Sequence, residues 1–272
     1  MSNKGTVNSH YIPKLYQRNW ECKEAKKHVW QFEKDYQTTK KVAIKNNCSA
    51  RYLYEPDVNH PTNVFEMKHK QEIEDVYCEK LRSLLKRINC IVNISENDKN
   101  IILTLFKNFS TRNPDNLYNN PINNAIVSNF TLGDTDKERE KRFLLNILPF
   151  TDISSLDGYK VELLYSPQGY ICFSDCITIE SQYYDEMYFP LSPYVVAFVS
   201  KSARSIDKNI RRITVREIDS IINMYIASDK VKRIYSDKKQ LIDYIKERYI
   251  FWEKYINPSI MKMLIRKEEI YL

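Results

Sequence analysis

The apolar residues of this chain change their spacing along its length, and this change restricts the fold more than any other feature. From about Val64 to Ile91 they recur every three or four residues, which predicts one long helix with a single apolar face. From Tyr159 to Val199, short runs of β-branched and aromatic residues separated by turn residues predict strands. After Ser200 the helical spacing returns. Helices and strands that occupy separate stretches of sequence predict an α+β fold.

Shorter patterns complete the predicted order of elements. Pro13 suits the first turn of a helix over Lys14–Trp20, and alternating residues predict a β-hairpin from His28–Lys34 and Thr39–Lys45. Ser95, followed by acidic residues, starts a second long helix that ends near Arg112.

The later part of the chain adds a small mixed or antiparallel sheet and C-terminal helices. Tyr159–Tyr165 and Gly169–Phe173 flank a Ser-Pro-Gln-Gly turn and predict a second hairpin. Other predicted segments are a loop at 113–131, a helix at 136–147, strands near 177–179, 188–191 and 194–199, helices at 218–226 and 241–255, and a short helix after Asn257-Pro258.

Neither an internal repeat nor a low-complexity linker divides the sequence, so a single domain over residues 1–272 is predicted. Residues 1–8 are expected to be disordered, and residues 201–272 to form a basic helical part. Each run of apolar residues is too short to span a membrane, and no signal peptide precedes the first predicted element. We therefore expect a cytoplasmic protein without a membrane partner.

Composition excludes several classes of site. The four glycines are scattered, whereas a phosphate-binding loop needs clustered glycines, so Walker and Rossmann nucleotide sites are disfavoured. The six cysteines form no C-x-x-C pair, and the four histidines form no zinc-binding spacing. Buried free thiols are the expected state of Cys172 and Cys176.

The net charge of +7 is concentrated at one end of the chain. Residues 201–272 contain 17 Lys and Arg against 10 Asp and Glu, whereas the first 200 residues are neutral. A basic segment is typical of proteins that bind an anionic partner, most simply nucleic acid. The alternative is a helical region with a lysine-rich, solvated face.

The segment Ser9–Trp20 contains an unusual density of special side chains. His10 precedes the predicted helix and lies near Arg18 in sequence. A histidine there can act as a general acid or base, or it can simply cap or pack on the small helix.

Carboxylates and an arginine on the predicted long helices are further candidates. Glu66, Lys70 and Glu74 are spaced four apart, with His69 and Glu72 nearby. They form either a salt-bridged solvent face or a set of inward carboxylates that bind a metal or polarise a histidine. Arg112, at a helix end, satisfies last-turn carbonyls or binds a phosphate.

Asp175 lies among apolar residues at the end of a predicted strand. A buried carboxylate without a partner is costly, so Asp175 needs a metal, an arginine, a histidine or a set of backbone N–H groups. It is either a site residue or the cap of the next turn.

Several short motifs occur in a fixed order along the chain. They are His10-Tyr11-x-Pro13 with Arg18 and Trp20, Arg51-Tyr52-Leu53-Tyr54, Glu66 with Ile73-Glu74, Arg112-Asn113-Pro114, Ser174-Asp175, Pro190-Leu191-Ser192-Pro193, Ile222-Asn223 with Ala227, and Arg233–Ser236. This ordered set resembles a bacterial family of uncharacterised proteins, domain of unknown function 4238. Where that family has Ser-Asp-x-Pro, this chain has Ile177 in place of the proline.

The resemblance implies a scaffold whose matching polar residues converge in one pocket. Those residues are His10, Arg18, Glu66, Glu74, Arg112, Asp175 and Asn223. The resemblance does not indicate an activity.

Two classes of function fit these observations. The first is a hydrolase acting on nucleic acid, such as a nuclease-like toxin or phage-defence effector. Its catalytic residues would be His10, Glu66, Glu74 and Asp175, its substrate-binding residues Arg18, Arg112 and Asn223, and its metal Mg²⁺. The second is a non-enzymatic sensor that binds a ligand or partner and in which the same polar residues form a structural network.

Overall fold

The computed structural model describes residues 8–51, 64–88, 93–112, 153–177, 179–180, 186–201 and 209–255. The chain forms two compact units. Unit 1 comprises Met1–Tyr16 and Asn47–Tyr159, and unit 2 comprises Gln17–Asn46 and Lys160–Leu272. The predictions for 1–7, 113–131, 136–147 and the end of the chain after 255 lie outside the described residues, but Asn8 begins a strand instead of belonging to a disordered end. The single domain stays a prediction.

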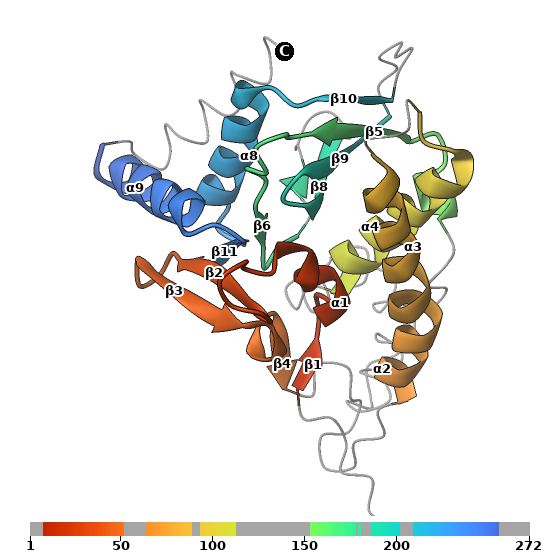
Figure 1. Cartoon of the computed structure of the whole chain (residues 1–272), viewed down its shortest axis with the longest axis horizontal. Helices are drawn as coiled ribbons and strands as arrows, with labels where there is room; N and C mark the ends of the chain where they lie inside the picture. Colours follow the sequence, from red (N-terminus) through yellow and green to blue (C-terminus); the bar gives the residue numbers. More distant parts are fainter. Residues whose placement is uncertain are drawn as a thin grey trace, which may run out of the picture. The chain divides into compact units, whose positions relative to one another are not determined.

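Unit 1 combines a small strand pair with helices. Strand β1 (Asn8–His10) pairs antiparallel with β4 (Ser49–Arg51). Helix α1 (Lys14–Gln17), at whose end the chain passes into unit 2, and the 3-10 turn η1 (Arg18–Trp20) of unit 2 confirm the predicted short helix. The other helical elements among the described residues of unit 1 are α2 (Val64–His69), the π-helical η3 (Lys70–Glu74), α3 (Asp75–Arg87), α4 (Glu96–Arg112) and η5 (Ser154–Leu156). Figure 1 shows α3 and α4 side by side.

The predicted long helix is confirmed, with one change in its middle. Buried positions follow the sequence Ile73, Cys78, Leu81 and Leu84, so the first step is five residues long. The π-turn inserts one extra residue there and keeps both halves facing the core. Val76, expected on the apolar face, is consequently exposed.

Helix α4 begins and ends where the sequence predicts. The Ser95 hydroxyl accepts from the Asp98 N–H at 3.2 Å, and the Asp98 carboxylate accepts from the Ser95 N–H at 3.1 Å. This reciprocal pair satisfies two N–H groups at the helix start. Arg87, at the end of α3, forms an ion pair with Asp98 and so ties the two helices together.

The described residues of unit 2 form two sheets and the helices α8 and α9. One sheet has the order β10-β5-β9-β8-β7 and the other β3-β2-β11-β6. Their strands are β2 (His28–Glu33), β3 (Thr38–Ala43), β5 (Lys160–Tyr165), β6 (Phe173–Ser174), β7 (Ile179–Glu180), β8 (Glu186–Ser192), β9 (Val195–Ser200), β10 (Ile210–Arg212) and β11 (Arg233–Ser236). The 3-10 turn η2 (Ile44–Asn46) follows β3.

The first predicted hairpin is confirmed and the second is wrong. Strands β2 and β3 pair antiparallel over their whole length. Strand β5, however, pairs with β9 on one edge and with β10 on the other, so neither edge is left for the chain after the turn. Gly169 closes that turn at φ +65°, and Ile171 then donates to the Pro193 carbonyl at 3.1 Å. Phe173 and Ser174 enter the other sheet as β6.

Helices α8 (Val215–Ala227) and α9 (Lys239–Tyr255) confirm the predicted C-terminal helices. The stretch was expected to be wholly helical, yet β10 and β11 lie within it and complete the two sheets. Both helices lie side by side in Figure 1. They share a core with both sheets, and its largest members include Phe32, Tyr225 and Phe198. Of the helices in the described ranges, none is both long and apolar enough to cross a membrane.

Candidate functional site

The π-turn of unit 1 brings a histidine and a carboxylate together. In a π-helix, residues five apart are neighbours. His69 Nδ1 lies 3.6 Å from Glu74 Oε1, and Lys70 Nζ lies 3.6 Å from Asp75 Oδ2, which is the same five-residue spacing twice. Lys70 therefore pairs with Asp75 and not with the glutamates four residues away on either side.

His69 is buried, with 3% of its surface exposed, and both of its ring nitrogens face oxygen acceptors. Its Nε2 lies 3.3 Å from Asn108 Oδ1, on α4. The Asn108 amide donates to the Thr104 carbonyl at 2.7 Å, and this fixes which end of the amide faces the ring. The contact with Asn108 is within hydrogen-bond distance, whereas the contact with Glu74 is longer and is a close approach of a ring nitrogen and a carboxylate oxygen.

Glu66 lies one turn before His69 on the same helical run. It is half-buried, and its Oε2 atom is shielded from solvent. The carboxylates of Glu66 and Glu74 are thus directed at least partly inward. Glu74 also contacts a histidine, as expected if these carboxylates polarise a histidine and do not form a solvent-exposed face. The sequence pattern indicated only that His69 lies near these glutamates. Its contact with Glu74 could not be predicted, because residues five apart are not neighbours in an α-helix.

The other two candidates of unit 1 have less defined surroundings. His10 is the last residue of β1, lies opposite Ser49 of β4 and is buried. Arg112 is the last residue of α4, as predicted, and its side chain lies outside the described part.

Arg18, Asp175 and Asn223 belong to unit 2. Arg18 is exposed on η1, while its neighbours fix this turn to the unit. Asn19 Nδ2 donates to the Leu191 carbonyl at 2.9 Å, and Trp20 Nε1 donates to the Ile171 carbonyl at 3.1 Å. Two of the unusual side chains in Ser9–Trp20, those of Asn19 and Trp20, therefore serve to attach this segment to unit 2.

The sequence required a partner for Asp175, and the structure shows a set of backbone N–H groups. Its Oδ1 accepts from the N–H groups of Lys232 and Arg233, both at 3.1 Å. Burial raises the pKa of this carboxyl to about 6, although the two backbone hydrogen bonds act in the opposite direction. Asp175 thereby holds the start of β11 beside β6.

Asn223 also has a structural role in this geometry. Its Oδ1 accepts from Arg248 Nε at 2.7 Å, and Arg248 Nη1 lies 3.2 Å from Asp219 Oδ1. The asparagine and the aspartate are on α8 and the arginine is on α9. This network therefore joins the two helices.

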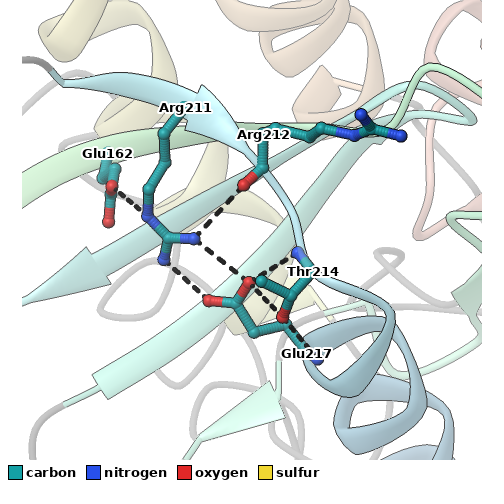
Figure 2. Close-up of polar contacts among 5 residues, drawn as sticks. All are labelled: Glu162, Arg211, Arg212, Thr214 and Glu217. Carbon is teal, nitrogen blue, oxygen red and sulfur yellow. Dashed lines mark hydrogen bonds and ion pairs between the residues drawn. The ribbon is translucent and has the colours of Figure 1, made fainter.

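Several Arg and Lys side chains of residues 201–272 form ion pairs with carboxylates inside unit 2. Figure 2 shows the most developed case, in which Arg211 donates to Glu162 at 2.6 Å and to both carboxylate oxygens of Glu217 at 2.7 and 3.1 Å. The hydrogen bonds to Glu217 raise the pKa of the Arg211 guanidinium. Further ion pairs join Arg233 to Glu33 and Lys239 to Asp243.

No three His, Cys, Asp or Glu side chains of the described residues are placed to share a metal ion. Cys172 is a buried free thiol, as expected, and burial raises its pKa. Cys176 is also a free thiol but is only half-buried, which differs from the expectation.

Comparisons with known proteins bear on the family and not on the activity. No curated protein and no solved structure matches the chain. A family model described as a protein of unknown function (DUF4238) matches residues 8–145, just over half of the 272 residues, which include β1 and the helices that carry Glu66, His69 and Glu74. The chain therefore belongs to the DUF4238 family.

Proposed function

We propose that this protein is a hydrolase acting on nucleic acid, of the kind used as a toxin or phage-defence effector, and that its acid–base groups lie on the α2–η3–α3 run. The observation that carries this proposal is the chain of contacts from Asn108 through His69 to Glu74. It places the Glu74 carboxylate beside a buried imidazole, with Glu66 two turns earlier on the same helical run.

A carboxylate in this position suits two tasks in phosphodiester hydrolysis. It can take a proton from the attacking water, or it can bind Mg²⁺, a hard cation that prefers oxygen ligands. Glu66 and Glu74 would be the protein ligands of such an ion, with waters and phosphate oxygens completing its shell. His10 remains the proposed second acid–base residue of unit 1, and Arg112 the proposed phosphate ligand.

The test is cleavage of labelled RNA and DNA by the purified full chain, with and without Mg²⁺. Glu74→Gln keeps the size of the side chain and a hydrogen-bonding oxygen but removes the charge, so we expect cleavage to fall at least about a hundredfold. Glu72→Gln is the matched control, because Glu72 is an exposed carboxylate in the same π-turn, and its variant should cleave normally. An inactive wild-type chain would refute the proposal.

A second candidate is a non-enzymatic module that binds a ligand or a protein partner. The bonding of Asp175 and Asn223 favours it, because both side chains are occupied by contacts that hold unit 2 together. In this case the polar residues of unit 1 would be structural as well.

Thermal unfolding separates the two candidates. If His10→Ala, Glu74→Gln and Asp175→Ala each lower the melting temperature strongly and no cleavage is seen, the network is structural. If Glu74→Gln melts like wild type and a cellular phenotype is lost, the residue serves function directly.

A further inference from the structure

Helix α9 has a second stripe, of partly exposed residues, beside the face that packs into unit 2. The packed face, with Leu241, Ile242 and Ile245, is buried in the core. In the second stripe, Tyr244 is 41% exposed, Phe251 55% and Tyr255 62%, and the Tyr244 hydroxyl donates to Asp219 of α8 at 3.1 Å. Isolated exposed aromatics are ordinary, but these three and Arg248 are spaced by four, three and four residues. That spacing aligns them along one side of the helix, as in a helix that packs against another helix.

The stripe is preorganised. The rings of Phe251 and Tyr255 lie 5.0 Å apart. Arg248 is held by Asn223 and Asp219, and its guanidinium lies 5.8 Å from the centre of the Tyr244 ring. Aromatic residues and arginine dominate the energetic centres of protein interfaces, and little side-chain entropy would be lost on binding here.

The flanking charges indicate what covers the stripe. Glu247 and Lys254 are both exposed and seven residues apart, so they lie on the same flank. When two identical helices pair antiparallel, this flank meets the same flank of the other copy. Glu247 of one copy then faces Lys254 of the other, and the contact occurs twice. Parallel pairing would instead require the opposite flank, where Ile245 and Trp252 pack into unit 2.

We propose that α9 is a homodimerisation surface, on which a second copy of this chain packs its own α9 antiparallel about a twofold axis near residue 250. The same register places Tyr244 opposite Tyr255 and Arg248 opposite Phe251 of the second copy. A stripe whose members match each other under this rotation is self-complementary, as a twofold interface requires. The proposal does not depend on the catalytic role of unit 1.

Sedimentation velocity on the full chain, over about 1 to 100 μM, tests the surface. We expect wild type to form dimers as the concentration rises. Phe251→Lys should weaken the dimer at least about a hundredfold, because it removes two aromatic rings and places each new positive charge opposite Arg248 of the other copy. Tyr36→Lys, which changes an exposed aromatic of the β2–β3 turn in the same unit, is the matched control and should dimerise normally.

A charge-exchange experiment tests the antiparallel register. Glu247→Lys alone and Lys254→Glu alone each replace two attractive contacts with repulsive ones, so each should weaken self-association about tenfold. Mixed in equal amounts, the two variants restore both pairs and should form heterodimers of near wild-type affinity.

Two results would overturn the proposal. One is a wild-type chain that stays monomeric at every concentration, which would leave the stripe to another segment or partner. The other is a dimer that Phe251→Lys does not affect, or single charge variants that gain nothing on mixing.

Discussion

Asp175 shows how a residue can look catalytic and still be explained by backbone contacts. Its neighbours in sequence are apolar, so its charge stands out, and burial raises its pKa to about 6. Both features are also typical of active sites. The structure identifies a simpler partner, because the N–H groups of Lys232 and Arg233, at the start of β11, bind its Oδ1. What the carboxylate provides there is an acceptor oxygen, and the charge itself is unfavourable.

This distinction gives a prediction for Asp175→Asn, which keeps the acceptor and removes the charge. The pKa is higher in the folded chain than in the unfolded chain, so Asp175 favours folding below about pH 4 and loses this contribution as pH rises through 6. The full loss is on the order of 3 kcal/mol. The variant should therefore be more stable than wild type at pH 7.5 and similar to it near pH 4.

Urea unfolding at several pH values measures the difference. Asp175→Ala is the control, because it removes the acceptor for two N–H groups. It should cost about 1 to 3 kcal/mol near pH 4 and should be less stable than Asp175→Asn at every pH. A variant Asp175→Asn that is less stable than wild type at pH 7.5 would show that the charge itself holds β11.

At the scale of single elements, the start of α8 is the best-defined local structure. Thr214 Oγ1 accepts from the Glu217 N–H at 3.2 Å, and the Glu217 carboxylate accepts from the Thr214 N–H at 2.8 Å. Figure 2 shows that the same carboxylate binds Arg211 of β10. One side chain thus caps the helix and fixes the preceding strand.

We expect Thr214→Ala to lower the free energy of unfolding by about 1 kcal/mol, because the cap of the Glu217 N–H is lost. Thr214→Ser keeps the hydroxyl and should stay within a few tenths of a kcal/mol of wild type. Denaturant titration of both variants checks this, and equal losses in the two would show that the threonine methyl group, not the hydroxyl, stabilises this turn.

The π-turn gives a second prediction at this scale. Deleting Gln71, an exposed residue, should convert α2–η3–α3 into a continuous α-helix. Residues before the deletion would rotate by about 100° relative to α3, so His69 and Cys78 could no longer face the core together. We expect a loss of at least about 2 kcal/mol, whereas Gln71→Ala, which keeps the residue count, should melt like wild type.

These elements also show which features the sequence could predict. The long helices, the first hairpin and the class of fold were predictable, since each depends on a repeated local pattern. The π-turn was not, because a single five-residue step looks like a flaw in an α-helical pattern. Strands β10 and β11 were missed because each is only three or four residues long and lies next to a strongly helical stretch.

The candidate site was predictable only in part, for the same physical reason. Glu66 and Glu74 could be singled out as spaced carboxylates, but the contact of Glu74 with His69 depends on the π-turn. The bonds of Asp175 and Asn223 join residues 25 or more positions apart, and no local pattern contains them.

At the scale of the whole molecule, the path of the chain through the two units bears on whether they unfold together. Each is built from two separate stretches, and the chain passes between them at residues 16–17, 46–47 and 159–160. When unit 2 folds, it fixes both ends of the long segment from Asn47 to Tyr159. The entropy cost of bringing the ends of that segment together, on the order of 4 kcal/mol, then belongs to the folding of unit 2 and no longer opposes the folding of unit 1.

We therefore expect one cooperative transition, as the predicted single domain implies. Leu84→Ala in unit 1 and Ile242→Ala in unit 2 each empty a fully buried site and should each cost about 2 to 5 kcal/mol. With coupled units, calorimetry should show a single peak that both variants move to lower temperature. Two peaks, each moved by only one variant, would show that the closure entropy is too small to couple the units, and the chain would then consist of two domains interleaved in sequence.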